Sequence, residues 1–182
     1  MVDDNTPLLI GAGQFSERPG TDGYRQLSPT DLAAEAARAA CDDALSATAL
    51  VPHIDAIFAV RTVGDSVPAM MKASAAPFGG PDNVPGAVAA RLGATPAVSV
   101  YSPACGDEPQ KLLGEACERL HAGEFKLALL CGGEAISTTR AARSAGQVLD
   151  WNEHVAAPFD DRSTNPVQRS RHMMDHLSLI HI

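Results

Sequence analysis

The stretch "AVSVYSPACGDEPQKLLGEACERLHAGEFKLALLCGG", residues 97–133, decides the fold. Its first part, AVSVYS (97–102), is rich in β-branched and aromatic residues and predicts a strand. An amphipathic helix is predicted over 108–124 with Gly123 as its stop, followed by a second strand over 125–133. We expect the helix to bury one apolar face, which is formed by Leu112, Leu113, Ala116, Cys117 and Leu120. A strand, a helix and a strand at this spacing indicate a parallel pair of strands joined by a crossover helix.

The same alternation of strands and helices extends toward the N-terminus. Residues 28–47 carry helix-start chemistry, with Ser28 as the cap, Pro29 in the first turn and Asp31 at the positive end of the helix dipole. The further expected elements are a short buried strand at 7–13, a strand at 54–63 and a short helix at 84–94 that Gly93 closes. These elements predict an α/β fold, with a mostly parallel mixed sheet and helices on both faces.

The pattern divides the chain into three parts. Residues 1–144 are predicted to form the α/β domain, and 145–176 are polar and irregular, as expected at the start of a loop region. Residues 177–182, LSLIHI, change character abruptly and match the translated end of a common transposon-derived DNA adapter. We therefore expect 177–182 to be a non-native tail, with a natural C-terminal strand or tail as the alternative.

Composition restricts the functions that the protein can have. The chain has 182 residues, with 14 Lys and Arg against 22 Asp and Glu, and its net charge is −8 without a basic stripe. We therefore expect no binding of nucleic acid or of an anionic membrane by bulk charge. The four cysteines include no CxxC pair, the N-terminus is acidic, and no apolar run approaches the ~20 residues that span a bilayer. We expect a cytoplasmic protein with free thiols.

Cys105 is the thiol whose position indicates chemistry, because it follows a strand and precedes the first turn of a helix. A helix N-terminus carries roughly half a positive charge, which lowers a thiol pKa from its usual ~8.5 and holds an oxyanion. Asp107 and Glu108 follow at once, and their negative charge opposes a thiolate. The residues alone leave two readings open, a nucleophile or an ordinary small residue, whereas burial in the core is expected for Cys41, Cys117 and Cys131.

Two other motifs are weaker. Gly11 and Gly13 in GAGQFS suggest a dinucleotide fingerprint, but no helix follows them, so we expect a strand end with unusual backbone angles instead. His172 and His176 in HMMDH are spaced like zinc ligands on a helix, but Met173 stands where a hydrolytic zinc site needs glutamate. No metal site is predicted.

Taken together, these residues resemble the N-terminal half of the thiolase superfamily. The resemblance is carried by a cysteine after a strand, a glycine, a glutamine, a "HAGE" turn and a strand end reading GGEAIS, here Cys105, Gly106, Gln110, Ala122, Gly123 and 132–137. The segments LLIGAGQFSER, SPTDLAAEAARAA and TTRAARSAGQVLDW are similar to the thiolase-like, sterol-carrier-type acetyl-CoA acetyltransferase branch. The resemblance covers about 7–151.

The resemblance implies the N-terminal half of the thiolase fold, with 145–176 beginning the region that binds coenzyme A. Cys105 would be the catalytic, acylated residue, with an acyl-CoA thioester as substrate, no bound cofactor and no metal, in lipid metabolism. The residues that contact coenzyme A stay unassigned. The resemblance also implies a homodimer that pairs through the strand 97–102, or a heteromer with an accessory subunit. Half a fold would expose an apolar sheet face, so we expect the isolated chain to self-associate.

The chain departs from the family pattern beside its cysteine. Thiolases carry a small residue and then Ser-Gly there, whereas this chain reads Gly106, Asp107, Glu108, Pro109; members of the branch often have glycine in place of the cysteine. The family's activating histidine and second cysteine belong to a C-terminal half that this chain lacks. The first hypothesis is an inactive fragment of a coenzyme-A-dependent acyltransferase with an acyl-cysteine intermediate. The alternative is a non-catalytic acyl-CoA-binding or aldolase-type heteromeric subunit.

Overall fold

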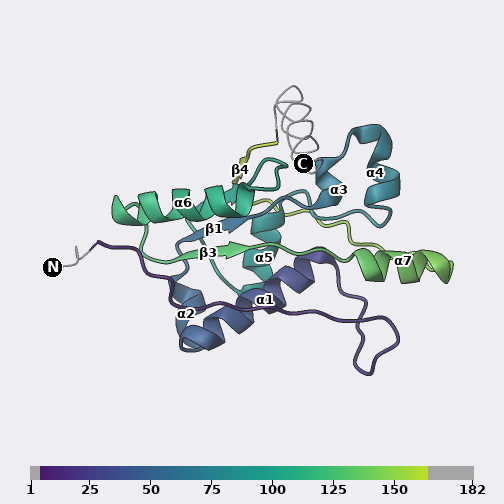
Figure 1. Ribbon diagram of the computed structural model, residues 1–182, viewed down its shortest axis with the longest axis horizontal. Helices are drawn as coiled ribbons and strands as arrows, with labels where there is room; N and C mark the ends of the chain where they lie inside the picture. The colour runs from purple at the N-terminus through teal and green to yellow at the C-terminus, as the bar shows by residue number, and fades with distance from the viewer. Residues whose placement is uncertain (1–4, 164–182) are drawn as a thin grey trace, which may run out of the picture.

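A computed structural model describes residues 5–163 and contains one parallel sheet (Figure 1). Its four strands have the order β3-β1-β2-β4, and they are β1 (Ala56–Ala59), β2 (Val98–Tyr101), β3 (Ala128–Cys131) and β4 (Asp160–Asp161). The α-helices are α1 (Pro29–Ala44), α2 (Ala47–Leu50), α3 (Val63–Ser66), α4 (Ala69–Ala75), α5 (Val84–Leu92), α6 (Glu108–His121) and α7 (Ile136–Ser144), and a short 3-10 turn, η1, covers Val51–His53. The α/β fold is confirmed, and every strand pair described is parallel.

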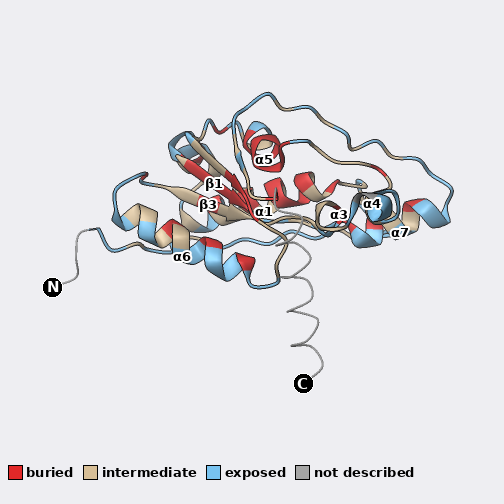
Figure 2. Ribbon diagram, turned by 90° about the horizontal axis from the view of Figure 1, so that it is seen from above, coloured by how far each residue is buried: buried red, intermediate tan, exposed pale blue. Residues whose placement is uncertain are grey.

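Helices cover both faces of the sheet, so the described residues form three layers. On one face, Ile57 of β1 and Leu129 of β3 pack with Ala37 of α1 and Ala89 of α5. On the other face, alternate residues of β1 pack against α6 through Phe58, Leu112, Ala116 and Phe125. The buried strands lie between the two helix layers (Figure 2). Alternate side chains of one strand therefore stabilise opposite layers.

The helix boundaries follow the local chemistry read from the sequence. The Ser28 hydroxyl accepts a hydrogen bond from the Asp31 N–H (3.1 Å), and the Asp31 carboxylate accepts one from the Ser28 N–H (3.0 Å), which completes a capping box. Gly93, with φ +82°, ends α5, and Gly123, with φ +76°, follows the end of α6. The predicted strands at 54–63, 97–102 and 125–133 are all present, in shortened form.

The predicted buried strand at 7–13 is wrong, because the segment has no regular structure and its apolar side chains face outward. Leu8 and Leu9 are 74% and 83% exposed. A Cβ on Gly11 would lie 2.3 Å from the Ala40 carbonyl oxygen, and one on Gly13 would lie 2.2 Å from the Ala40 nitrogen. The backbone thus packs on α1 instead of pairing with β3. Close approach, and not an unusual backbone angle, is what these two positions require of glycine.

One further expectation is corrected. Leu113, expected on the buried face of α6, is 38% exposed, and Cys117 and Leu120 beside it are half-buried. The segment between β1 and α5 contains the short helices α3 and α4. Farther along the chain, Trp151 packs edge-on against Phe78, with ring centroids 5.3 Å apart. None of the helices within 5–163 has both the length and the apolarity needed to cross a membrane.

The close contact of Gly13 predicts a stability difference between two glycine substitutions. Gly13→Ala places a methyl group inside the backbone of α1, so the free energy of unfolding should fall by about 1–3 kcal/mol. Gly114→Ala, at an open position within α6, is the control and should raise it by up to about 1 kcal/mol. Urea unfolding followed by circular dichroism measures both values. Equal stability of the two variants would contradict the packing of 7–13 on α1.

Candidate functional site

Cys105 lies in the turn that links the carboxyl end of β2 to the start of α6. Arg61 holds the beginning of this turn through two hydrogen bonds to Ser102. Its side-chain Nε donates to the Ser102 carbonyl oxygen (2.6 Å), and its backbone N–H donates to the Ser102 hydroxyl (3.0 Å). The Arg61 guanidinium lies over the Tyr101 ring, 3.9 Å from its centroid, and forms an ion pair with Asp161. Residues from three strand ends therefore hold the backbone that leads to the thiol.

The immediate neighbour of the Cys105 thiol is a carboxylate. Its Sγ donates to Asp107 Oδ1 at 2.7 Å, and the Lys111 ammonium lies 3.0 Å from the other Asp107 oxygen. Lys111 also lies 3.4 Å from Glu108, whose side chain is buried at the first turn of α6. Asp107 and Glu108, the two residues expected from the sequence to oppose a thiolate, therefore both pair with Lys111.

The charges around Cys105 keep its proton in place. Burial and then the hydrogen bond to Asp107 raise the pKa of the thiol, against the smaller opposing effect of Lys111. The same hydrogen bond from Cys105, together with Lys111, lowers the pKa of Asp107 to about 2. At pH 7 the Cys105 thiol is therefore neutral and donates the hydrogen bond. The Asp107 carboxylate is ionised and accepts it. The helix N-terminus does not prevail over the adjacent carboxylate here.

Cys105, Asp107 and Glu108 also bring three potential metal-ligating atoms within 4.8 Å of one another. The Lys111 ammonium already occupies a cation's position beside both carboxylates. Lys111 thus balances the negative charge of Asp107 and Glu108. His172 and His176 lie outside the described residues.

The other three thiols differ from Cys105. Cys41 is buried in α1, and burial raises its pKa. Cys117 and Cys131 are half-buried on α6 and β3, and desolvation raises the pKa of the Cys131 thiol to about 12. None of these three precedes the first turn of a helix, as Cys105 does.

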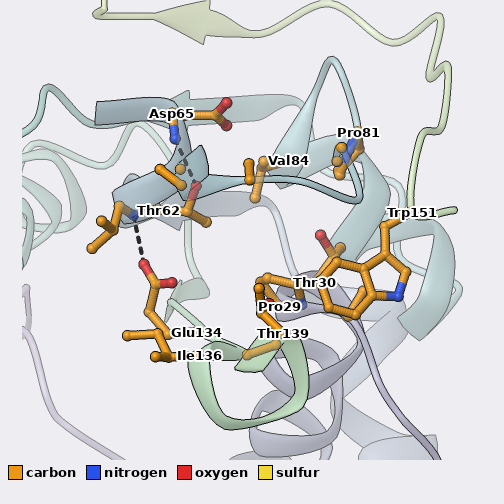
Figure 3. A pocket seen from close by; sticks show the side chains of 18 of the residues that line it. Pro29, Thr30, Thr62, Asp65, Pro81, Val84, Glu134, Ile136, Thr139 and Trp151 are labelled. Atoms are coloured by element: carbon orange, nitrogen blue, oxygen red, sulfur yellow. Dashed lines mark hydrogen bonds between the residues drawn. The ribbon is translucent and has the colours of Figure 1, made fainter. Parts of the chain in front are cut away.

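A separate pocket of about 280 Å³ lies between the segments that follow β1 and β3, and Cys105 does not line it (Figure 3). The Glu134 carboxylate accepts a hydrogen bond from the Val63 N–H (2.6 Å), and burial raises the pKa of Glu134. Asp65 accepts a hydrogen bond from the Tyr101 hydroxyl (2.9 Å). Trp151 closes the opposite wall. The pocket joins two carboxylates and two arginines, Arg140 and Arg143, to apolar walls and suits a small polar ligand.

Sequence reasoning did not find this pocket. The sequence feature that could have indicated the pocket is Gly-Gly-Glu at 132–134, where a strand ends in two glycines and a glutamate follows. A Cβ on Gly133 would lie 2.2 Å from the Pro29 carbonyl oxygen, so the glycine lets α1 begin against the end of β3. The pocket needs residues from several separate segments, among them 28–30, 62–65, 134–136 and Trp151, and no single stretch of sequence contains them together.

The comparisons with known proteins gave a structural match. No family model and no curated protein matches the chain. The crystal structure of a monomeric SCP2-thiolase-like protein type 1 from Mycobacterium smegmatis is similar, with a TM-score of 0.55 and 32% sequence identity. The match covers 71% of this chain and 24% of that one, so the aligned part spans about a quarter of the neighbour's length.

The contact between Cys105 and Asp107 predicts a change in thiol reactivity. Asp107→Asn removes the carboxylate that keeps the thiol protonated, so alkylation of Cys105 by iodoacetamide at pH 7.5 should accelerate several-fold and its pH profile should move to lower pH. Peptide mapping by mass spectrometry separates Cys105 from the other three cysteines.

The matched control is Glu118→Gln, which removes one negative charge from an exposed position of the same helix and should leave the Cys105 rate unchanged. Slower alkylation in Asp107→Asn would show instead that the carboxylate acts as a base that activates the thiol.

Proposed function

Because the chain belongs to the SCP2-thiolase-like group of the thiolase superfamily, we propose that it supplies the acyl-accepting cysteine of a coenzyme-A-dependent acyltransferase. The observation that carries the proposal is the position of Cys105 at the strand-to-helix turn between β2 and α6. Arg61 holds the start of this turn through Ser102, and Cys105 lies three residues before Glu108, where α6 begins. Cytoplasmic location and a role in lipid metabolism accompany this proposal.

The proposed reaction transfers an acyl group between two sulfur atoms. The Cys105 sulfur attacks the carbonyl carbon of an acyl-CoA thioester, an S–C bond to Cys105 forms, and the bond from the carbonyl carbon to the coenzyme A sulfur breaks. The thiol proton passes to the departing coenzyme A thiolate, so the products are acyl-Cys105 and free coenzyme A. Asp107 accepts the hydrogen bond of the thiol and orients it, and a carboxylate with a pKa of about 2 is a weak base for removing the proton.

A second candidate function is supported by the same contact. A thiol that stays protonated beside Asp107 suits a protein that binds acyl-CoA without forming an acyl-enzyme. In this alternative, a non-catalytic or aldolase-type subunit, Cys105 fills space at the acyl position. Assembly as a homodimer or heteromer remains a proposal for either function, and the similar mycobacterial protein is described as monomeric.

Incubation with acetyl-CoA distinguishes the two functions. For an acyltransferase, wild-type protein should gain the mass of one acetyl group on Cys105, and Cys105→Ala should gain none there. Cys117, half-buried on α6, is the internal control and should stay unmodified. Intact-mass and peptide spectra measure the gain. Equal acetylation of all thiols would mean non-specific transfer and would sink the proposal.

Isothermal calorimetry of the unacylated protein tests the alternative. Binding of acetyl-CoA that survives in Cys105→Ala, without acetylation of the wild type, would favour the non-catalytic subunit. Absence of both binding and acetylation would contradict both functions.

A further inference from the structure

The pocket between the segments that follow β1 and β3 contains two charged groups that the protein does not pair (Figure 3). Four of its lining residues are charged, and two of these four have partners. Asp65 forms an ion pair with Lys72 (3.0 Å), and Arg143 donates to a backbone carbonyl oxygen of α4 (3.4 Å). The other two charged residues are Glu134 and Arg140. The pocket therefore offers one negative and one positive group to a ligand.

Glu134 is the negative group. Its Oε1 accepts the hydrogen bond from the Val63 N–H (2.6 Å), and within residues 5–163 its Oε2 accepts none. Burial raises the pKa of Glu134, and the negative charge of Asp65 adds to the rise. An ammonium group beside Oε2 would stabilise the ionised carboxylate, because an opposite charge offsets the lost hydration.

Arg140 is the positive group. It lies on α7, six residues after Glu134, and in the described part of the chain its guanidinium has neither an ion-pair partner nor a hydrogen-bond acceptor. The two opposite charges thus line one cavity without contacting each other. A guanidinium binds a carboxylate through two parallel N–H···O bonds, so a ligand carboxylate is the matching partner for Arg140.

The remaining walls restrict the size and polarity of the ligand. Apolar side chains line the pocket from several segments, among them Ala76, Pro81, Val84, Ile136 and Trp151. The volume of about 280 Å³ is close to the lower limit of roughly 300 Å³ for small-molecule sites. The pocket thus has room for a small molecule whose body is apolar.

We propose that this pocket binds a small zwitterion with an apolar body, of the kind that a free aliphatic amino acid provides. The ammonium of the ligand pairs with Glu134, its carboxylate pairs with Arg140, and its side chain lies against the apolar walls. A zwitterion has no net charge, which matches a lining with two negative and two positive groups. Cys105 does not line the pocket, so this inference stands apart from the proposed acyl transfer.

L-Leucine is the probe that tests the inference, and two matched compounds each lack one of its charges. Isocaproate lacks the ammonium, isoamylamine lacks the carboxylate, and both keep the branched chain. Trp151 is the only tryptophan of the chain, so its indole N–H gives a single cross peak in proton–nitrogen NMR spectra. This cross peak should shift in a saturable way with L-leucine. Each matched compound should bind roughly tenfold or more weakly, because one charged group of the pocket then stays unpaired.

Two variants show which group each end of the ligand contacts. Arg140→Gln should weaken binding of L-leucine by roughly tenfold or more and leave isoamylamine unchanged, since that compound has no carboxylate. Glu134→Gln keeps an oxygen that can accept from the Val63 N–H, and it should weaken L-leucine while leaving isocaproate unchanged. The control, Arg18→Gln, removes a positive charge from an exposed position outside the pocket and should bind L-leucine as the wild type does.

Three results would overturn the inference. The first is an absent or non-saturable shift of the Trp151 cross peak with L-leucine, and the second is equal affinity of the wild type for all three compounds. The third is loss of L-leucine binding in Cys105→Ala, because Cys105 does not line the pocket. The unfolding midpoint of each variant in urea, measured beside its affinity, separates a lost contact from a lost fold.

Discussion

The rest of the structure depends on the pairing of β1 with a parallel neighbour on each side. Its four residues, Ala56–Ala59, are at most 1% exposed, and β3 and β2 bond to its two edges in register. Because successive side chains point to opposite faces, Ile57 anchors α1 and α5 while Phe58 anchors α6. The segments that follow β1 and β3 then meet over the carboxyl end of the sheet, where the pocket lies. The same pairing places the end of β2, and with it Cys105, at that end of the molecule.

The pKa of the Cys105 thiol depends on the groups closest to its sulfur atom. A helix N-terminus favours a thiolate, but it acts as a partial charge spread over several N–H groups. The Asp107 carboxylate is a full charge in direct contact with the sulfur at 2.7 Å. Burial of the thiol and then its hydrogen bond to Asp107 raise the pKa of Cys105. Lys111 limits the effect by neutralising part of the carboxylate charge. A substrate that displaces the Lys111 ammonium or the thiol proton would change this balance.

Much of the fold could be predicted from the sequence where local chemistry and burial agree. The capping box at Ser28 and the glycine at 93 fix helix ends through contacts within a few residues. Prediction failed at 7–13, where a strand-like sequence packs its glycines on α1, because that contact joins segments about 30 residues apart. Leu113 failed for a related reason, since its exposure depends on which segments pack against that face of α6, and the residues of the helix alone do not fix this. The position of Cys105 was readable, but the hydrogen bond to Asp107 depends on the geometry of the turn, which residue types alone do not fix.

The contacts of Arg61 with Ser102 and Asp161 affect when the site forms during synthesis of the chain. Arg61 joins Ser102 to Asp161, so the turn before Cys105 acquires its full set of contacts only when a segment 100 residues after Arg61 has been made. At typical synthesis speeds of about 5–20 residues per second, that interval lasts roughly 5–20 s. For the last 56 residues of this interval, from Cys105 to Asp161, the nascent chain carries the thiol while Arg61 can contact Ser102 but not yet Asp161. Formation of the site is thus timed by the ribosome as well as by the chemistry of the cysteine.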